Sequence, residues 1–109
     1  METKNSNDGS QNNSQTGETT RAVEIREVAT LLVLLVRALV DFPNDVAVRP
    51  VAGAQAVIFE VGVHPEDVRR LIGKKGRTAD AIREILTNLG SKARSRYLLE
   101  VIEPAERAR

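Results

Sequence analysis

The longest hydrophobic segment of the chain has the periodicity of an α-helix. Within residues 23–41, apolar side chains recur at the i, i+3, i+4 and i+7 spacing of one helix face: Val28, Leu31, Leu32, Leu35 and Leu39. Further apolar residues widen this face, so we expect cover on more than one side. A deep place in the core and a contact with another protein both explain such a helix. We favour the core, because a small domain has few other apolar segments.

Two segments after this helix alternate with the period of a β-strand. Val46 and Val48 predict a short strand, and Pro50 should end it or confine it to a sheet edge, because proline has no amide donor. Residues 57–63 alternate over a longer stretch and predict a second strand with one core face. Gly53 lies between the two segments. We therefore predict a hairpin.

Two helices and a last strand complete the predicted order. A short helix should follow the hairpin and end at Gly73, and a second should cover residues 77–89 with Gly90 at its C-terminal end. Residues 90–95 are predicted to be a flexible basic loop, and residues 97–103 a third strand. The fold class is therefore α+β, in the order helix, strand, strand, helix, helix, strand (α-β-β-α-α-β). A three-stranded sheet should be backed by three helices.

Length and composition allow one small domain. The chain has 109 residues. Residues 1–22 are polar and predict a disordered tail, which leaves a domain over residues 23–103 and a short tail over residues 104–109. No apolar run approaches the ~20 residues of a membrane span, and no signal peptide is recognisable. We expect a soluble cytoplasmic protein that makes no membrane contact.

The residue types needed for catalysis or metal binding are scarce. Cysteine is absent and His64 is the only histidine. A turn or helix-capping role suits His64, since no set of ligands surrounds it. We therefore predict no catalytic residue, no metal site and no cofactor, and we do not expect an enzyme.

Charge is concentrated in the second half of the chain. The net charge is only +1, yet residues 66–96 carry nine basic side chains against four acidic ones. Such asymmetry is typical of a protein that binds a polyanion. A solvated helix surface explains the charge equally well.

A glycine-rich turn with two lysines lies inside this basic stretch. Residues 71–78 read Leu-Ile-Gly-Lys-Lys-Gly-Arg-Thr, between two predicted helices. Glycine permits positive φ angles and the close approach of another chain. The helix that starts near Arg77 should direct free amide groups toward the turn, where a phosphate would be stabilised. Two glycines at this spacing are a weak signal alone, and the surrounding element order strengthens it.

The segment 63–86, together with the element order, resembles a KH domain. More narrowly, the run from Ile72 to Thr78 with residues 81–83 is similar to small bacterial KH proteins of the KhpA type, in the type II arrangement. The resemblance implies a cleft that grips about four nucleotides of single-stranded RNA. The loop before the last strand would form the opposite wall. The RNA-binding residues expected on this basis are Arg70, Ile72, Gly73, Lys74, Lys75, Gly76, Arg77, Lys92, Arg94 and Arg96.

The resemblance also implies a biological setting. It implies an RNA chaperone or post-transcriptional regulator that acts with a KhpB-like partner, linked in some bacteria to cell-wall synthesis and cell shape. Two alternatives remain open. The apolar first helix and Ile85 suit an interaction module that joins two copies or one copy and a KhpB-like protein, with incidental RNA binding. Single-stranded DNA is the other ligand, and Tyr97, the only candidate for base stacking, is better explained as a core residue.

Overall fold

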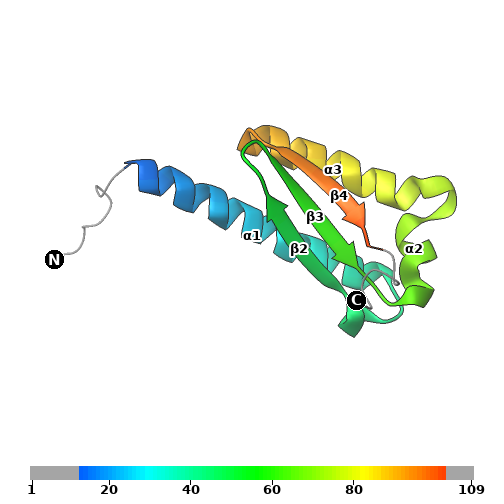
Figure 1. The fold of residues 1–109 in the computed structure, drawn as a ribbon. Coiled ribbons are helices and arrows are strands. Elements are labelled where there is room, and N and C mark those ends of the chain that lie inside the picture. Colours follow the sequence, from blue (N-terminus) through cyan, green and yellow to red (C-terminus); the bar gives the residue numbers. More distant parts are fainter. Residues whose placement is uncertain (1–12, 103–109) are drawn as a thin grey trace.

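The fold is one mixed sheet with helices packed against it (Figure 1). The computed structural model describes the backbone of residues 13–102 and the side chains of residues 20–102. In chain order the elements are α1 (Asn13–Leu39), β2 (Ala47–Ala52), β3 (Ala56–Gly62), α2 (Val68–Ile72), α3 (Arg77–Ala93) and β4 (Arg96–Val101). Single 3-10 turns precede β2, α2 and α3. The predicted α+β class and the predicted element order are confirmed.

The sheet has the strand order β2-β3-β4, with an antiparallel and a parallel pairing. β2 and β3 form the predicted antiparallel hairpin, and β3 pairs in parallel with β4. Pro50 lies inside β2 opposite Phe59, so it does not end the strand, but β2 is an edge strand as the missing amide donor requires. The parallel pairing forces the chain to travel back along the whole sheet between β3 and β4, and α3 makes that crossing.

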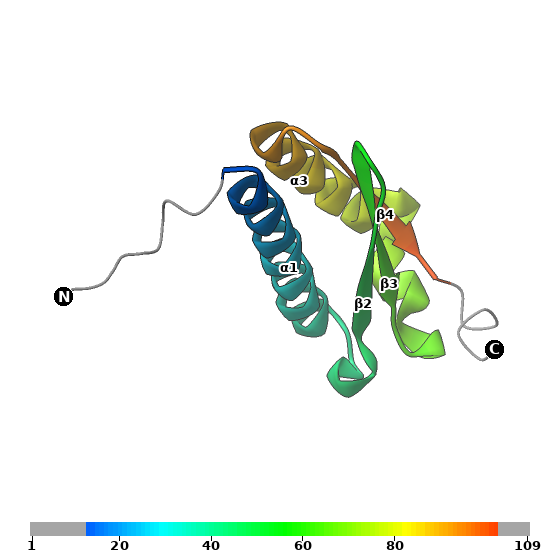
Figure 2. The same ribbon diagram turned by 60° about the vertical axis from the view of Figure 1, so that its left-hand side comes forward.

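One face of the sheet forms the core. Figure 2 shows α1 and α3 on the same side of the three strands. The buried side chains of this layer come from α1, α3 and alternate positions of β3 and β4: Val28, Leu32, Val36, Val57, Phe59, Val61, Ile82, Leu86, Tyr97 and Leu99. The rings of Phe59 and Tyr97 meet edge to face with centroids 5.2 Å apart. Tyr97 is thus a core residue, which agrees with the preferred interpretation of the sequence.

Helix α1 is longer than its hydrophobic pattern predicts. It begins at Asn13 rather than near residue 23, so part of the predicted tail is helical, while residues 1–12 and 104–109 lie outside the described residues. The Arg21 guanidinium donates a hydrogen bond to the Gly53 carbonyl at 2.6 Å. This contact ties the polar half of the helix to the hairpin turn, and hydrophobic periodicity cannot reveal it.

The connection from α3 to β4 differs from the predicted flexible loop. The helix continues through Gly90 to Ala93, and Arg94 then turns the chain with a left-handed backbone conformation of φ 58°. Gly90 is buried, and a Cβ atom there would lie 2.5 Å from the Ser95 carbonyl oxygen. The glycine therefore permits close packing of helix against returning chain, and it does not end the helix.

Candidate nucleic-acid interface

The Gly73–Gly76 turn has the backbone geometry that its glycines predict. Both glycines have positive φ angles, 83° and 76°, and the Gly76 amide donates to the Gly73 carbonyl oxygen at 3.0 Å. A Cβ atom on Gly73 would collide with Thr78, with 2.7 Å to its backbone nitrogen. At Gly76 the nearest atom would be 3.9 Å away. Gly73 is thus required by space and by conformation, and Gly76 by conformation alone.

The turn opens on an uncapped helix N-terminus. α3 begins at Arg77 directly after the turn, where the Arg77 amide donates to the Lys74 carbonyl oxygen and no side chain caps the amides that follow. The 17 residues of α3 give a macrodipole whose positive end faces the turn. Lys74 and Lys75 are both exposed beside it. Free amides, the dipole and two ammonium groups together form a favourable place for a phosphate.

Arg70 and Ile72 lie next to the turn on α2. Ile72 is half-buried and borders the turn. The Arg70 guanidinium is 3.4 Å from the Asp41 carboxylate, in a pair whose two side chains are mostly exposed. An exposed pair of this kind contributes little to stability. Arg70 is therefore available to a phosphate at little cost.

A hollow lies between the C-terminal half of α3 and the start of β4, toward the end of α3 that is far from the turn. It is lined by Thr87, Ser91, Ser95, Arg96, Tyr97 and Leu98. Within the described residues β4 pairs only with β3, so alternate backbone N–H and C=O groups of β4 face outward and are free to bond. Sequence reasoning missed Thr87, Ser91 and Leu98. Thr87 and Ser91 lie four residues apart on the polar face of α3, and that spacing was the available signal.

The segment that was predicted to form the opposite wall of the cleft lies far from the glycine turn. Lys92, Arg94 and Arg96 are all exposed, but they gather where α3 ends and β4 begins. Since α3 has 17 residues and rises ~1.5 Å per residue, its ends are roughly 25 Å apart. The parallel pairing of β3 and β4 is the cause, because α3 must span the sheet. The basic residues therefore mark the two ends of one strip along α3 and β4, with Gly73–Arg77 and Arg70 at one end.

No other chemical centre emerges from the described part of the chain. No group of three or more histidine or acidic side chains within residues 20–102 could hold a metal ion. The Nδ1 atom of His64 accepts a hydrogen bond from the Glu66 amide at 3.0 Å, so His64 caps the turn before α2. No helix within residues 13–102 is long and apolar enough to cross a membrane.

Comparison with known proteins gives the family. Residues 29–101 match the model of the KhpA/KhpB KH domain, which covers most of the fold described above. The chain belongs to the KhpA/KhpB KH-domain family. This is a family of binding domains rather than of enzymes. The first half of α1 lies outside the matched region of this KH protein.

The curated relatives of this KhpA-type protein are smaller and are covered almost completely. An RNA-binding protein KhpA of Clostridium acetobutylicum is 42% identical over 72 residues, which are 66% of this chain and 96% of the relative. The proteins of the same name from Listeria monocytogenes and Chlamydia pneumoniae are 40% and 38% identical, with 96% and 92% of their lengths covered. No solved structure gives a significant match.

Proposed function

We propose that this KhpA-type protein binds single-stranded RNA along the strip formed by α3 and the edge of β4. The uncapped start of α3, which opens on the Gly73–Gly76 turn beside two exposed lysines, is the observation that carries the proposal. The curated relatives named RNA-binding protein KhpA support it.

The turn is suited to the RNA backbone. A phosphate placed there would accept hydrogen bonds from the uncapped amides that follow Arg77 in the first turn of α3 and charge-assisted bonds from Lys74 and Lys75. Gly73 keeps the turn free of a side chain, so the sugar–phosphate backbone can approach it closely. A strand that continues from the turn along α3 would then reach the hollow between α3 and β4, where the free edge of β4 offers donors and acceptors.

The same surface explains weak discrimination among bases. Of the three aromatic side chains, Phe59 and Tyr97 are buried against each other. Phe42 is exposed but stacks on His64 outside the strip. The strip therefore offers no exposed aromatic side chain for the stacking that strengthens many contacts to single strands. We expect binding governed by the backbone and tolerant of sequence. Single-stranded DNA is the corresponding alternative ligand, and competition between RNA and DNA oligomers of one sequence distinguishes the two.

The decisive experiment reverses the charge of the turn. Lys74→Asp combined with Lys75→Asp should abolish most RNA binding, because both side chains are exposed and face the proposed phosphate. Arg26→Asp combined with Arg37→Asp makes the same change in net charge on the exposed surface of α1 and serves as the matched control. Binding of a labelled unstructured RNA is measured by anisotropy, and circular dichroism checks the fold. Equal loss in both variants, or no loss in either, would show that the turn is not the binding site.

The wider role follows from the family. We propose an RNA chaperone or post-transcriptional regulator in the cytoplasm that acts with a KhpB-like partner and contributes to cell-wall synthesis and cell shape. The support is the resemblance to KhpA-type proteins alone. If the protein does not copurify with a KhpB-like protein, or if RNA profiles are unchanged after deletion of its gene, this role is contradicted.

A second candidate function is self-association. Leu31 and Leu34 are exposed on α1, and Ile85 is exposed on α3. Leu34 is 60% exposed and lies three residues after Leu31, so the two side chains are neighbours on one face of α1. Light scattering over a range of concentrations tests this function, and a mass of one chain throughout would exclude the homodimer.

A further inference from the structure

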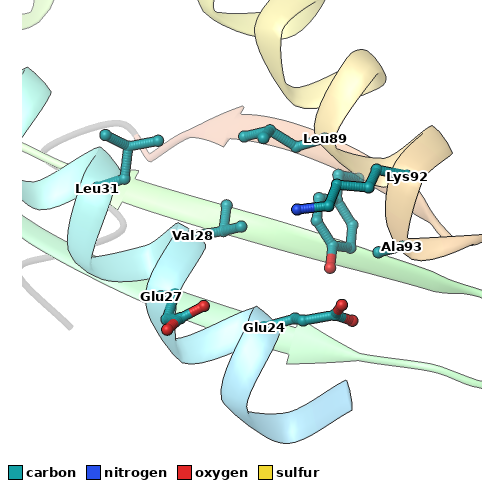
Figure 3. A pocket seen from close by; sticks show the side chains of 8 residues that line it. Glu24, Glu27, Val28, Leu31, Leu89, Lys92 and Ala93 are labelled. Carbon is teal, nitrogen blue, oxygen red and sulfur yellow. The ribbon is translucent and has the colours of Figure 1, made fainter. Parts of the chain in front are cut away.

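A pocket of about 180 Å³ lies between α1 and α3, away from the Gly73–Gly76 turn (Figure 3). Both helices pack on the sheet, and they make few contacts with each other. The pocket is lined by Glu24, Glu27, Val28, Leu31, Leu89, Lys92, Ala93 and Tyr97. Its walls come from residues spaced three or four apart on each helix, so each helix presents one continuous row of side chains to it.

The floor of the pocket contains a polar group without a partner. Tyr97 is only 4% exposed, and its ring packs on Phe59. Within the described residues its hydroxyl makes no hydrogen bond, although the side chain lines the pocket. A ligand in the pocket could give this hydroxyl the hydrogen-bond partner that the protein does not provide. Burial, and then the nearby Glu24 carboxylate, raise the pKa of Tyr97, so the hydroxyl keeps its proton at neutral pH.

The rim of the pocket carries more negative than positive charge. Glu24 and Glu27 come from α1, and Lys92 comes from α3 (Figure 3). No ion pair joins these three side chains in the part of the chain that the structure describes. The apolar wall is formed by Val28, Leu31, Leu89 and Ala93. An occupant should therefore combine an apolar body with a positive head.

We propose that this pocket binds a small organic cation, an alkyl amine or guanidine. The alkyl body would lie on Val28, Leu31 and Leu89. The cationic head would face Glu24 and Glu27, and its N–H groups would satisfy the Tyr97 hydroxyl. Lys92 is the chain's own cation at this rim, so it competes with the ligand. The proposal involves neither the glycine turn nor the outer edge of β4, and of the predicted RNA-binding residues it shares only Lys92.

Tyr97 provides a direct probe of occupancy. It is the only tyrosine and the chain has no tryptophan, so the intrinsic fluorescence of the protein reports on this one side chain. The full chain is titrated with hexylamine, hexanol and hexanoate, which share a body and differ in the head group. Hexylamine should give a saturable change at the lowest concentration. Equal responses to hexylamine and hexanol would show unspecific apolar binding and overturn the proposal.

Three substitutions test the charges at the rim, and a fourth is the control. Glu24→Gln and Glu27→Gln should each weaken hexylamine binding about two- to five-fold, the range of an exposed ion pair. Lys92→Gln should strengthen it by a similar factor, since the competing cation is gone. Glu100→Gln, on an exposed position of β4, is the control and should change nothing. Circular dichroism confirms that each variant is folded.

Two results would contradict the proposal. One is hexylamine binding that is unaffected by both glutamate substitutions. The other is a response of Tyr97 fluorescence only to an arginine-containing peptide and to none of the free amines, which would assign the pocket to a side chain of a protein partner.

Discussion

The buried carboxylate of Asp67 holds the backbone of Phe42. Its Oδ2 atom accepts a hydrogen bond from the Phe42 amide at 2.9 Å, and its Oδ1 atom accepts one from the Asp41 amide at 3.0 Å. Asp67 is 1% exposed and lies at the start of α2, whereas Asp41 and Phe42 follow the end of α1. This pair of bonds positions α2, and with it Gly73 at the far end of that short helix.

Asp67→Ala should therefore destabilise the domain. Two part-buried amides would lose their acceptors, and the loss should be near the lower end of the about 1–3 kcal/mol that an orphaned buried group costs. Asp67→Asn should cost less, since one acceptor oxygen remains. Urea unfolding followed by circular dichroism measures both. Glu66→Gln, an exposed neighbour, is the control and should stay within about 0.5 kcal/mol of the parent. A change for Asp67→Ala as small as that of the control would contradict the role given to Asp67.

Two glycines should respond differently to one added methyl group. Gly90→Ala places a Cβ atom 2.5 Å from the Ser95 carbonyl oxygen, so it should lower the free energy of unfolding, by about 1–3 kcal/mol as overpacking typically does. Gly53→Ala meets only the Ala56 carbonyl oxygen at 3.4 Å and should be neutral. Thermal unfolding of the two variants compares them directly. If Gly90→Ala leaves the thermal unfolding unchanged, α3 and the start of β4 can move apart at little cost in free energy.

The basic residues at the far end of α3 should matter only for long RNA. Arg94→Asn with Arg96→Gln leaves the glycine turn intact, and asparagine tolerates the left-handed conformation at residue 94. We expect unchanged binding of oligomers of about four nucleotides, the length a KH cleft holds. Binding of oligomers that span both ends should weaken, and the salt slope should shrink by about 0.7 per lost phosphate contact.

Lys74→Gln with Lys75→Gln is the matched comparison for that length series. This variant should bind RNA more weakly at every oligomer length, because the turn contacts even the shortest oligomer. If the two variants show the same dependence on length, the two ends of α3 do not contribute separate contacts.

Ionisation of Tyr97 should occur above its ordinary pKa of 10.0. Burial is the main cause, the Glu24 carboxylate adds to it, and Arg21 opposes it. The folded state holds this proton more tightly than the unfolded state does. The contribution of Tyr97 to the free energy of unfolding is therefore complete below pH 10, and it is lost as the pH rises through the raised pKa of the folded protein. The phenolate absorbance measures it without interference, since there is one tyrosine. Glu24→Gln should lower the pKa of Tyr97 partway, and Arg21→Gln should raise it.

The glycine turn could be predicted because its geometry is local. Gly73 and Gly76 need positive φ angles whatever surrounds them, and the lysines between them are exposed because they belong to a tight turn. The strand pattern was equally readable, since alternation of Val57, Phe59 and Val61 reflects one buried face. The edge position of Pro50 followed from its missing amide donor.

The errors all concern contacts between distant segments. The N-terminal half of α1 is polar, so it has no hydrophobic periodicity from which a helix could be predicted. The hydrogen bond from Arg21 to the hairpin turn joins residues far apart in the chain. Gly90 was predicted to end a helix because glycine commonly does so, but its actual role depends on the backbone of Ser95. Nothing in the sequence shows that Asp67 is buried and accepts a hydrogen bond from the Phe42 amide.

The sequence by itself determined the order of the elements, the glycine turn and the family to which the chain belongs, because these depend on periodicity, backbone conformation and short motifs. Only the tertiary structure decided where Lys92, Arg94 and Arg96 lie relative to the turn and that α1 and α3 enclose a pocket over Tyr97. The physical reason is the parallel pairing of β3 with β4, which requires α3 to span the sheet and separates its two basic ends.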